Sequence, residues 1–191
     1  MGDAIDCRDP DLLMAEVVRL RGQVAALEAR VEELDRMAHD DPLVPAVNRR
    51  GMLRELEKLI ARCERRGEPS AMLFVDLDGL KILNDSFGHP GGDAALIHVA
   101  EQLRSGTRPM DCVARLGGDE FCVLLDHADE DSALETAERL INEIAGEDFI
   151  FDGLAMPLSV AIGVTLIEKG DTPASVLERA DRAMYRVKAA A

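Results

Sequence analysis

The sequence predicts a mixed α and β domain in which helices cover a central sheet, preceded by a helix that forms a parallel dimeric coiled coil. Two observations predict this fold class: helical and strand patterns alternate from residue 48 onward, and apolar residues repeat in heptads before residue 40. Of 191 residues, 47% are hydrophobic and 31% charged, a globular balance that suits one domain with a short extension. We place the coiled coil in residues 1–38 and the globular domain in residues 39–191.

The first helix carries a strict heptad repeat. Its a positions are Val17, Val24 and Val31, and its d positions are Leu13, Leu20, Leu27 and Leu34. β-Branched residues at a with leucine at d favour a parallel two-stranded coil. The flanking charges agree, because Glu16 would face Arg21 of a second copy and Arg30 would face Asp35. The alternative, an amphipathic helix packed on its own domain, usually has a wider apolar stripe, so the repeat favours a homodimer.

The rest of the chain alternates between helices and strands. Prolines at positions 42 and 45 end the first helix, since proline disfavours a helical residue before it, and they mark a junction over 38–46. Apolar spacing then predicts helices over 48–66, 80–84, 93–103, 132–145 and 173–187, and strands over 70–75, 112–116, 121–125, 149–151 and 158–166. Gly117 and Gly118 predict a hairpin turn between the second and third of these strands.

The net charge of −15, from 22 basic and 37 acidic residues, argues against polyanionic partners. Nucleic-acid binding needs a basic surface that displaces counterions from phosphates, and anionic membranes attract basic segments rather than acidic ones. The N-terminus lacks the layout of a signal peptide, and no apolar run is long enough to span a bilayer. The four cysteines, Cys7, Cys63, Cys112 and Cys122, form no zinc pattern. We therefore expect a cytoplasmic protein that binds neither nucleic acid nor membrane.

Acidic residues stand at two places that a sheet would bring together. Asp76 follows the strand at 70–75, with Asp78 two residues later, while Asp119 and Glu120 follow the glycine pair. Carboxylates at a strand end and on an adjacent hairpin can hold divalent cations between them, and Mg²⁺ leaves its other positions to water and phosphate oxygens. On spacing alone, a solvated acidic turn is the commoner outcome.

Several motifs occur around these carboxylates in a fixed order. They are Asp-Pro-Leu with Asn-Arg-Arg at 41–50, Asp-x-Asp-x-x-Lys-x-x-Asn-Asp at 76–85, Gly-His-x-x-Gly-Asp at 88–93, Arg-x-Gly-Gly-Asp-Glu-Phe at 115–121, Ser-x-x-Ile-Gly-Val at 159–164 and Ala-Asp-x-Ala-Met-Tyr-x-x-Lys at 180–188. Over residues 37–190 the chain resembles the GGDEF family, the diguanylate cyclases. The resemblance implies a nucleotidyl-cyclase or polymerase-palm-like fold with a mainly antiparallel sheet. It also implies condensation of two GTP molecules into cyclic di-GMP and two pyrophosphates across a homodimer.

The resemblance assigns roles to individual residues. The ligands of Mg²⁺ or Mn²⁺, two ions per site, would be Asp76, the Leu77 carbonyl, Asp119 and Glu120. Substrate would be bound by Asn84, Asp93, Lys81, Lys188 and the main chain of Asp78, Gly79 and Leu80. Asp93 and Asn84 would read guanine, which offers an N1–H and an amine to a carboxylate and acceptors to an amide. Asp119, Glu120 and Lys81 would be catalytic, and either acid could handle the proton of the ribose hydroxyl.

A second site is implied before the hairpin. Arg108 and Asp111 match the family's Arg-x-x-Asp inhibitory motif in spelling and in distance from Gly117, and Arg139 is a candidate second arginine by its spacing. The resemblance implies that cyclic di-GMP binds there and inhibits. A solvated turn is the simpler alternative for so short a motif.

The chain departs from the family pattern in three places. Val44-Pro45-Ala46 replaces Thr-Gly-Leu at the junction, Leu80 replaces a phenylalanine, and no arginine follows Lys188, which implies one phosphate contact fewer. Two other functions stay open: a non-catalytic receptor that binds cyclic di-GMP at the Arg-x-x-Asp motif, and a scaffold that binds GTP without turning it over. The intact acidic and basic motif residues favour the enzyme. The input signal is not indicated by the sequence.

Overall fold

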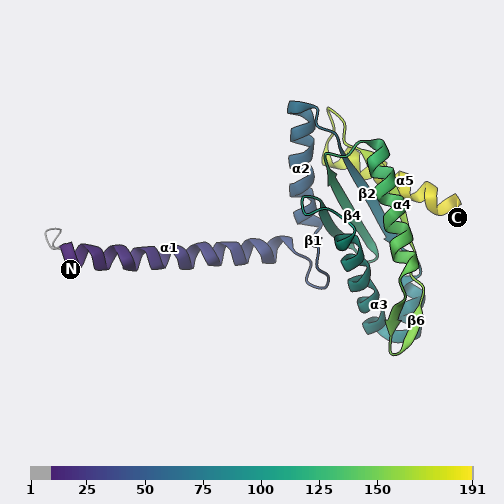
Figure 1. Ribbon diagram of the computed structural model, residues 1–191, viewed down its shortest axis with the longest axis horizontal. Helices are drawn as coiled ribbons and strands as arrows, with labels where there is room; N and C mark the ends of the chain where they lie inside the picture. The colour runs from purple at the N-terminus through teal and green to yellow at the C-terminus, as the bar shows by residue number, and fades with distance from the viewer. Residues whose placement is uncertain (1–9, 191) are drawn as a thin grey trace. The chain divides into compact units, whose positions relative to one another are not determined.

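A computed structural model describes residues 10–190, the last of them by its backbone alone, so Cys7 and the start of the expected coiled coil lie outside the described residues. The helices are α1 Pro10–His39, α2 Arg49–Arg66, α3 Leu80–Ser105, α4 Glu130–Gly146 and α5 Pro173–Ala190. The strands are β1 Val47–Asn48, β2 Ser70–Leu77, β3 Cys112–Gly117, β4 Glu120–Asp126, β5 Phe149–Phe151, β6 Leu154–Met156 and β7 Val160–Leu166 (Figure 1). The chain divides into two compact units between Ala38 and His39.

The first unit is the helix α1. It buries none of its described residues, and its predicted a and d side chains are 40–66% exposed. A stripe of valine and leucine left in water is unfavourable by about 25 cal/mol per Å² of apolar surface. Within residues 10–190, no helix has the length and apolarity of a membrane span.

The second unit is built on a five-stranded sheet in the order β1-β3-β4-β2-β7. All its pairings are antiparallel except that of β1 with β3. The mixed fold with a mainly antiparallel sheet is therefore confirmed. A separate two-stranded ladder joins β5 to β6.

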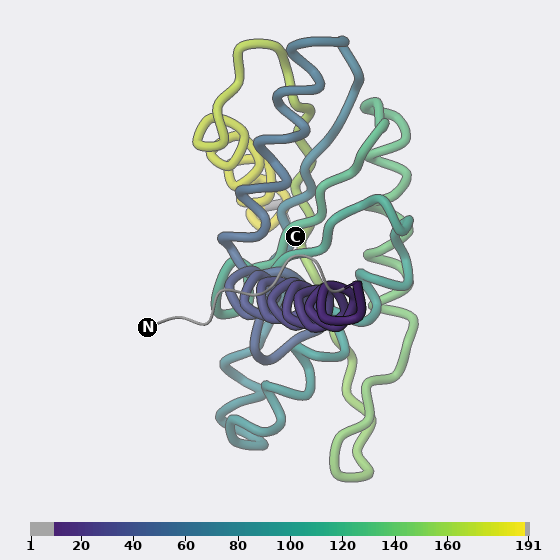
Figure 2. The backbone as a smooth tube through the Cα atoms, turned by 90° about the vertical axis from the view of Figure 1, so that its left-hand side faces the viewer, coloured from purple at the N-terminus to yellow at the C-terminus, as the bar shows by residue number. Residues whose placement is uncertain are grey.

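Helices cover both faces of this sheet. The strand β2 lies between β4 and β7, with all eight residues buried. Its alternate side chains Ala71, Leu73, Val75 and Leu77 join the core under α3 and α4, while Met72 and Phe74 join the core under α2 and α5. In Figure 2 the blue α2 and the yellow α5 accordingly lie on one side of the strands, and the green α4 lies on the other. Burial on both faces explains the unbroken apolar run of this strand.

The two helices predicted over 80–84 and 93–103 are the two halves of α3, which are separated at Gly88 with φ 70° and ψ 175°, so the predicted interruption is present. Two strands differ from the sequence-based expectation. The strand β1 was not predicted, because its two residues carry no readable periodicity. The strand β6 was not predicted either, although Asp152 and Gly153 both have positive φ, as an Asp-Gly hairpin turn requires.

Candidate active site

The two acidic places predicted from the sequence meet at one edge of the sheet. Asp76 is directly opposite Glu120 in the β2–β4 register, and the Leu77 N–H donates to the Asp119 carbonyl at 3.1 Å. Asp76 is 9% exposed, while Asp119 and Glu120 are half-buried. This strand end therefore brings three carboxylates and the Leu77 carbonyl into one neighbourhood.

The glycine turn that carries Asp119 is fixed by an arginine. Gly117 and Gly118 have φ of 144° and 57°, and the β3–β4 register shifts between Arg115 and Gly117. The Arg115 guanidinium donates to the Gly118 carbonyl through Nε at 3.1 Å and through Nη2 at 2.8 Å. Its Nη1 lies 3.6 Å from Asp41 Oδ1 in the segment that follows α1. The sequence analysis assigned no role to Arg115, although its position in the motif Arg-x-Gly-Gly-Asp-Glu-Phe could have indicated one.

The carboxylates share an unfavourable electrostatic environment. Burial raises the pKa of Asp76, Lys188 opposes this rise, and the charges of Asp119 and Asp78 add to it. Burial also raises the pKa of Glu120, with further contributions from Asp76, Asp119 and Asp181. Grouped acids of this kind favour a cation that relieves their repulsion.

Lys188 supplies one such cation from the last turn of α5. Its Nζ donates to Asp76 Oδ1 and lies 3.7 Å from Asp78 Oδ1. Partial burial opposes its charge, but the hydrogen bond to Asp76 and the acids around it raise the pKa of Lys188 overall. Among the described residues, no three His, Cys, Asp or Glu side chains converge closely enough to form a metal cage as they stand.

The residues expected to bind substrate lie along the start and the middle of α3. Gly79, with φ 72°, precedes the helix, and no side chain caps its first turn. The Asp78 N–H donates to the Ser159 carbonyl, and the Ser159 hydroxyl donates to Asp78 Oδ2, both at 2.9 Å. The main chain of Asp78, Gly79 and Leu80 was expected to contact phosphate. The Asp78 N–H has this partner inside the protein, so the contact with phosphate stays a prediction, with the N–H groups from Gly79 onward as its main donors.

Both halves of α3 contribute to the same site. Lys81 is exposed and Asn84 half-buried on the first half, while Asp93 is exposed at the start of the second. The break at Gly88 redirects the chain between them. The sequence analysis predicted a gap between two helices here but did not assign it to the backbone conformation of Gly88.

The Arg-x-x-Asp residues line a cavity of about 270 Å³ together with Arg139. Asp111 is held within its own turn, accepting from the Arg108 N–H at 2.9 Å and from the Asp126 N–H at 3.2 Å. Arg139 donates through Nη2 to the Gly106 carbonyl at 2.6 Å. The structure thus places all three predicted residues on one cavity.

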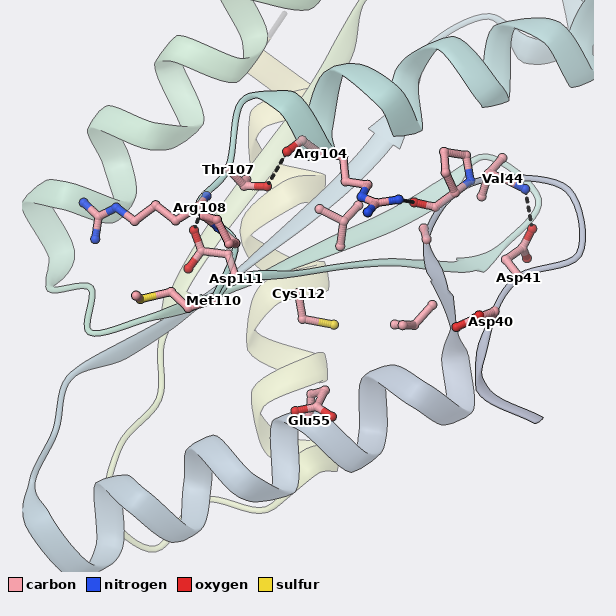
Figure 3. A pocket seen from close by; sticks show the side chains of 15 residues that line it. Asp40, Asp41, Val44, Glu55, Arg104, Thr107, Arg108, Met110, Asp111 and Cys112 are labelled. Carbon is pink, nitrogen blue, oxygen red and sulfur yellow. Dashed lines mark hydrogen bonds between the residues drawn. The ribbon is translucent and has the colours of Figure 1, made fainter. Parts of the chain in front are cut away.

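A larger cavity of about 880 Å³ adjoins this turn and shares Arg108 and Asp111 with it (Figure 3). It extends to the junction segment 40–47 and to Glu55 on α2. Arg104 reaches across it, with Nη1 3.5 Å from the Pro45 carbonyl. The junction that departs from the family pattern therefore lines a cavity together with the Arg-x-x-Asp turn.

A sheet edge that gathers carboxylates opposite a glycine hairpin, beside an uncapped helix start, defines a nucleotidyl-cyclase-like domain. Residues 38–191 match the family described as "Diguanylate cyclase, GGDEF domain", and the chain belongs to that family. The resemblance drawn from the sequence is thereby confirmed.

Two curated relatives illustrate the match. The chain is 35% identical to diguanylate cyclase DgcP of Pseudomonas aeruginosa over 178 residues, which is 93% of this chain and 26% of DgcP. It is 34% identical to the response regulator PleD of Caulobacter vibrioides over 188 residues, which is 95% of this chain and 41% of PleD. The chain thus spans less than half the length of either relative.

Solved structures agree on the fold. The coiled coil and GGDEF domain of DgcB from Caulobacter crescentus, in complex with c-di-GMP, superposes with a TM-score of 0.84 at 26% identity, covering 93% of this chain and 95% of that one. Diguanylate cyclase SiaD of Pseudomonas aeruginosa, in complex with its activator SiaC, gives a TM-score of 0.76 at 28% identity, covering 93% and 71%.

Proposed function

We propose that the chain is a diguanylate cyclase that condenses two GTP molecules into cyclic di-GMP and releases two pyrophosphates. One observation carries the proposal: Asp76 faces Glu120 in register, with Asp119 and Lys188 at the same strand end. A solvated acidic turn would not require a carboxylate as buried as that of Asp76. Because GTP is a cytoplasmic nucleotide, we propose that this domain lies in the cytoplasm. We also propose that it has no nucleic-acid or membrane partner.

The donor set fits Mg²⁺ or Mn²⁺. Asp76, the Leu77 carbonyl, Asp119 and Glu120 offer only oxygen atoms, which these ions prefer. Burial, with added repulsion between the neighbouring acids, raises the pKa of Asp76 and Glu120, and a divalent cation would favour their charged forms. We propose two ions per site, which when bound would supply positive charge to the α-phosphate and to the pyrophosphate leaving group.

The protein's own groups would bind and orient the substrate. Lys81 and Lys188 offset phosphate charge, and the uncapped first turn of α3 donates main-chain N–H groups to phosphate oxygens. The Asp93 carboxylate accepts from guanine N1–H and its amine, and the Asn84 amide donates to the guanine acceptors. Asp119 or Glu120 accepts the proton of the attacking 3′ hydroxyl, which the bound base and phosphates hold in line.

Catalysis across two domains makes a homodimer part of the proposal. Each domain holds one GTP, so the two sites must face each other. The exposed apolar stripe of α1 supports dimerisation through a parallel coiled coil. Such a coil raises the effective concentration of the second domain, typically into the millimolar range.

Product inhibition is proposed at the cavity formed by Arg108, Asp111 and Arg139. Guanidinium groups bind guanine edges or phosphates in bidentate fashion, which suits cyclic di-GMP. Added product should slow turnover, and Arg108→Ala should remove this effect without lowering the initial rate. Inhibition that survives in Arg108→Ala would refute this part of the proposal.

The central test is GTP turnover. Protein stripped of bound nucleotide and supplied with GTP and Mg²⁺ should form cyclic di-GMP and pyrophosphate in a 1:2 ratio. Asp119→Ala and Glu120→Ala should each abolish turnover and keep the native thermal melt. The control Asp131→Ala, on the exposed start of α4, should keep both turnover and the native melt. No product from the unsubstituted protein, or full turnover in both site variants, would refute the proposal.

Calorimetry separates the two alternatives. A receptor would bind cyclic di-GMP and ignore GTP, while a scaffold would bind GTP and never turn it over. The gathered carboxylates and lysines argue against the receptor, because binding product at the Arg-x-x-Asp cavity requires none of them.

A further inference from the structure

The two halves of α3 cross at very short range. Gly88 leaves the helical conformation, and Pro90 opens the second half, where a proline fits because the first turn needs no N–H. Directly after it, Gly91 and Gly92 are both buried. Neither has a positive φ, so space and not backbone conformation is what requires a glycine there.

Gly92 lies against the side-chain amide of Asn84. A Cβ built on Gly92 would stand 2.1 Å from Asn84 Oδ1, 2.9 Å from its Cγ and 3.2 Å from its Nδ2. Non-bonded carbon contacts are favourable only near 3.5–4.0 Å. The amide therefore occupies the volume that any larger residue at position 92 would fill.

We propose that Gly92 is a positioning residue for base selection: its missing side chain lets the Asn84 amide rest on the second half of α3, beside Asp93. The inference rests on the proposed function, in which Asn84 and Asp93 read guanine. An alanine at position 92 would push the amide away from the base while the phosphate-binding lysines keep their places. Gly92 itself touches no substrate and acts only through Asn84.

Gly91 provides a matched control. A Cβ there would lie 2.5 Å from the Phe87 Cβ and 3.4 Å from the Phe151 ring, so it meets an atom tied to the backbone. Phe87 and Phe151 form an edge-to-face pair with ring centroids 6.1 Å apart. Gly91→Ala should therefore lower the melting temperature. Gly92→Ala meets the rotatable end of a polar side chain and should change base selection instead.

The experiment measures the dissociation constants of GTP and ATP by calorimetry for the unsubstituted protein, Gly92→Ala, Asn84→Ala and the double variant. Adenine has an amine where guanine has an acceptor, so ATP reports the triphosphate contacts without the amide contact. Gly92→Ala should weaken GTP binding about tenfold, the loss of one hydrogen bond, and leave ATP binding unchanged. Adding Gly92→Ala to Asn84→Ala should weaken GTP binding no further.

The outcomes separate this inference from the proposed function. A protein that binds GTP no better than ATP overturns both. A selective protein whose Gly92→Ala variant keeps its GTP affinity, loses GTP and ATP affinity equally, or loses further affinity in the Asn84→Ala background overturns only the inference. If Gly92→Ala melts early, the double variant must recover the melting temperature of Asn84→Ala, because the clash would be gone; failure to recover would also refute the inference.

Discussion

Lys188→Met should strengthen metal binding and weaken GTP binding in the same protein. Lys188 Nζ donates to Asp76 Oδ1, and Asp76 is the most buried of the proposed carboxylate ligands, so a metal ion would have to displace the ammonium to reach that oxygen. The same lysine is proposed to contact phosphate once GTP is present. Removing it therefore removes a competitor of the metal and a ligand of the nucleotide.

The size of the first effect follows from the exposure of the pair. The Lys188 side chain is 34% exposed and that of Asp76 is 12% exposed, which is between a surface pair and a buried pair. Surface pairs contribute about 0.2–1 kcal/mol, and removing one partner of a buried pair costs about 3–5 kcal/mol. We expect about 1.4 kcal/mol here, which is a metal dissociation constant about tenfold lower. Loss of a charged phosphate contact should raise the GTP dissociation constant by about tenfold or more.

The assay titrates Mn²⁺ into nucleotide-free protein and follows free Mn²⁺ by electron paramagnetic resonance, with GTP binding measured separately by calorimetry. Arg186→Met is the control, because it removes the same charge from the exposed face of the same helix. A Lys188→Met variant whose Mn²⁺ affinity equals that of Arg186→Met, or falls below it, would refute competition at Asp76.

Three further perturbations test other parts of the structure. Asp171 accepts two hydrogen bonds of 2.6 Å from Arg179, which hold the pKa of Asp171 at about 2, so Asp171→Asn should lower the free energy of unfolding at pH 7 by about 2 kcal/mol. Because folding depresses this pKa, the stabilisation is complete above the ordinary Asp pKa of about 4 and is lost as pH falls towards 2. The melting temperatures of the two proteins should therefore converge as the pH approaches 2. A difference in melting temperature that stays constant with pH would contradict the assignment. Arg115→Lys keeps the charge but loses the paired hydrogen bonds to the glycine turn, so kcat should fall about tenfold with little change in melting temperature. If kcat and the melting temperature fell together, the role of Arg115 would be purely structural. Leu20→Glu with Leu27→Glu should lower specific activity at low protein concentration and spare it at high concentration, whereas activity independent of concentration would remove the coil from catalysis.

Local pattern predicted most of the fold because most elements are long enough to show a period. The strand β2 was predicted from its apolar run, and the hairpin was predicted from Gly117 and Gly118. The meeting of Asp76 with Glu120 followed, since a strand end and an adjacent hairpin share one sheet edge. The strand β6 was not predicted, although the sequence indicates it: Asp152-Gly153 between two apolar triplets is typical of a hairpin turn.

Contacts set by packing could not be read from pattern. The Lys188–Asp76 pair joins residues 112 positions apart and depends on how α5 lies against β7. The resemblance supplied Lys188 as a phosphate ligand, and only the three-dimensional arrangement shows it on a carboxylate. The contact of Asn84 with Gly92 likewise depends on how the two halves of α3 meet at Gly88, and the predicted gap between two helices does not determine that geometry.

The net charge of −15 first argued against polyanionic partners, yet the proposed substrate is itself a polyanion. Much of the excess lies outside the catalytic motifs of the sequence, since residues 126–152 carry ten acids and one base, and the first forty residues carry ten acids and five bases. A charge acts over a Debye length of about 8 Å at physiological salt, so a long nucleic acid would meet this acidic excess, whereas one nucleotide meets mainly the charges of its own site. Within the site, Asp76, Asp119 and Glu120 repel phosphate, and the ammonium of Lys188 is already engaged by Asp76. Without a divalent cation, only Lys81 and the main chain at the start of α3 would be left to bind the triphosphate. A cation held by Asp76 would free Lys188 as well, so we expect nucleotide affinity to fall sharply when the metal is removed by a chelator.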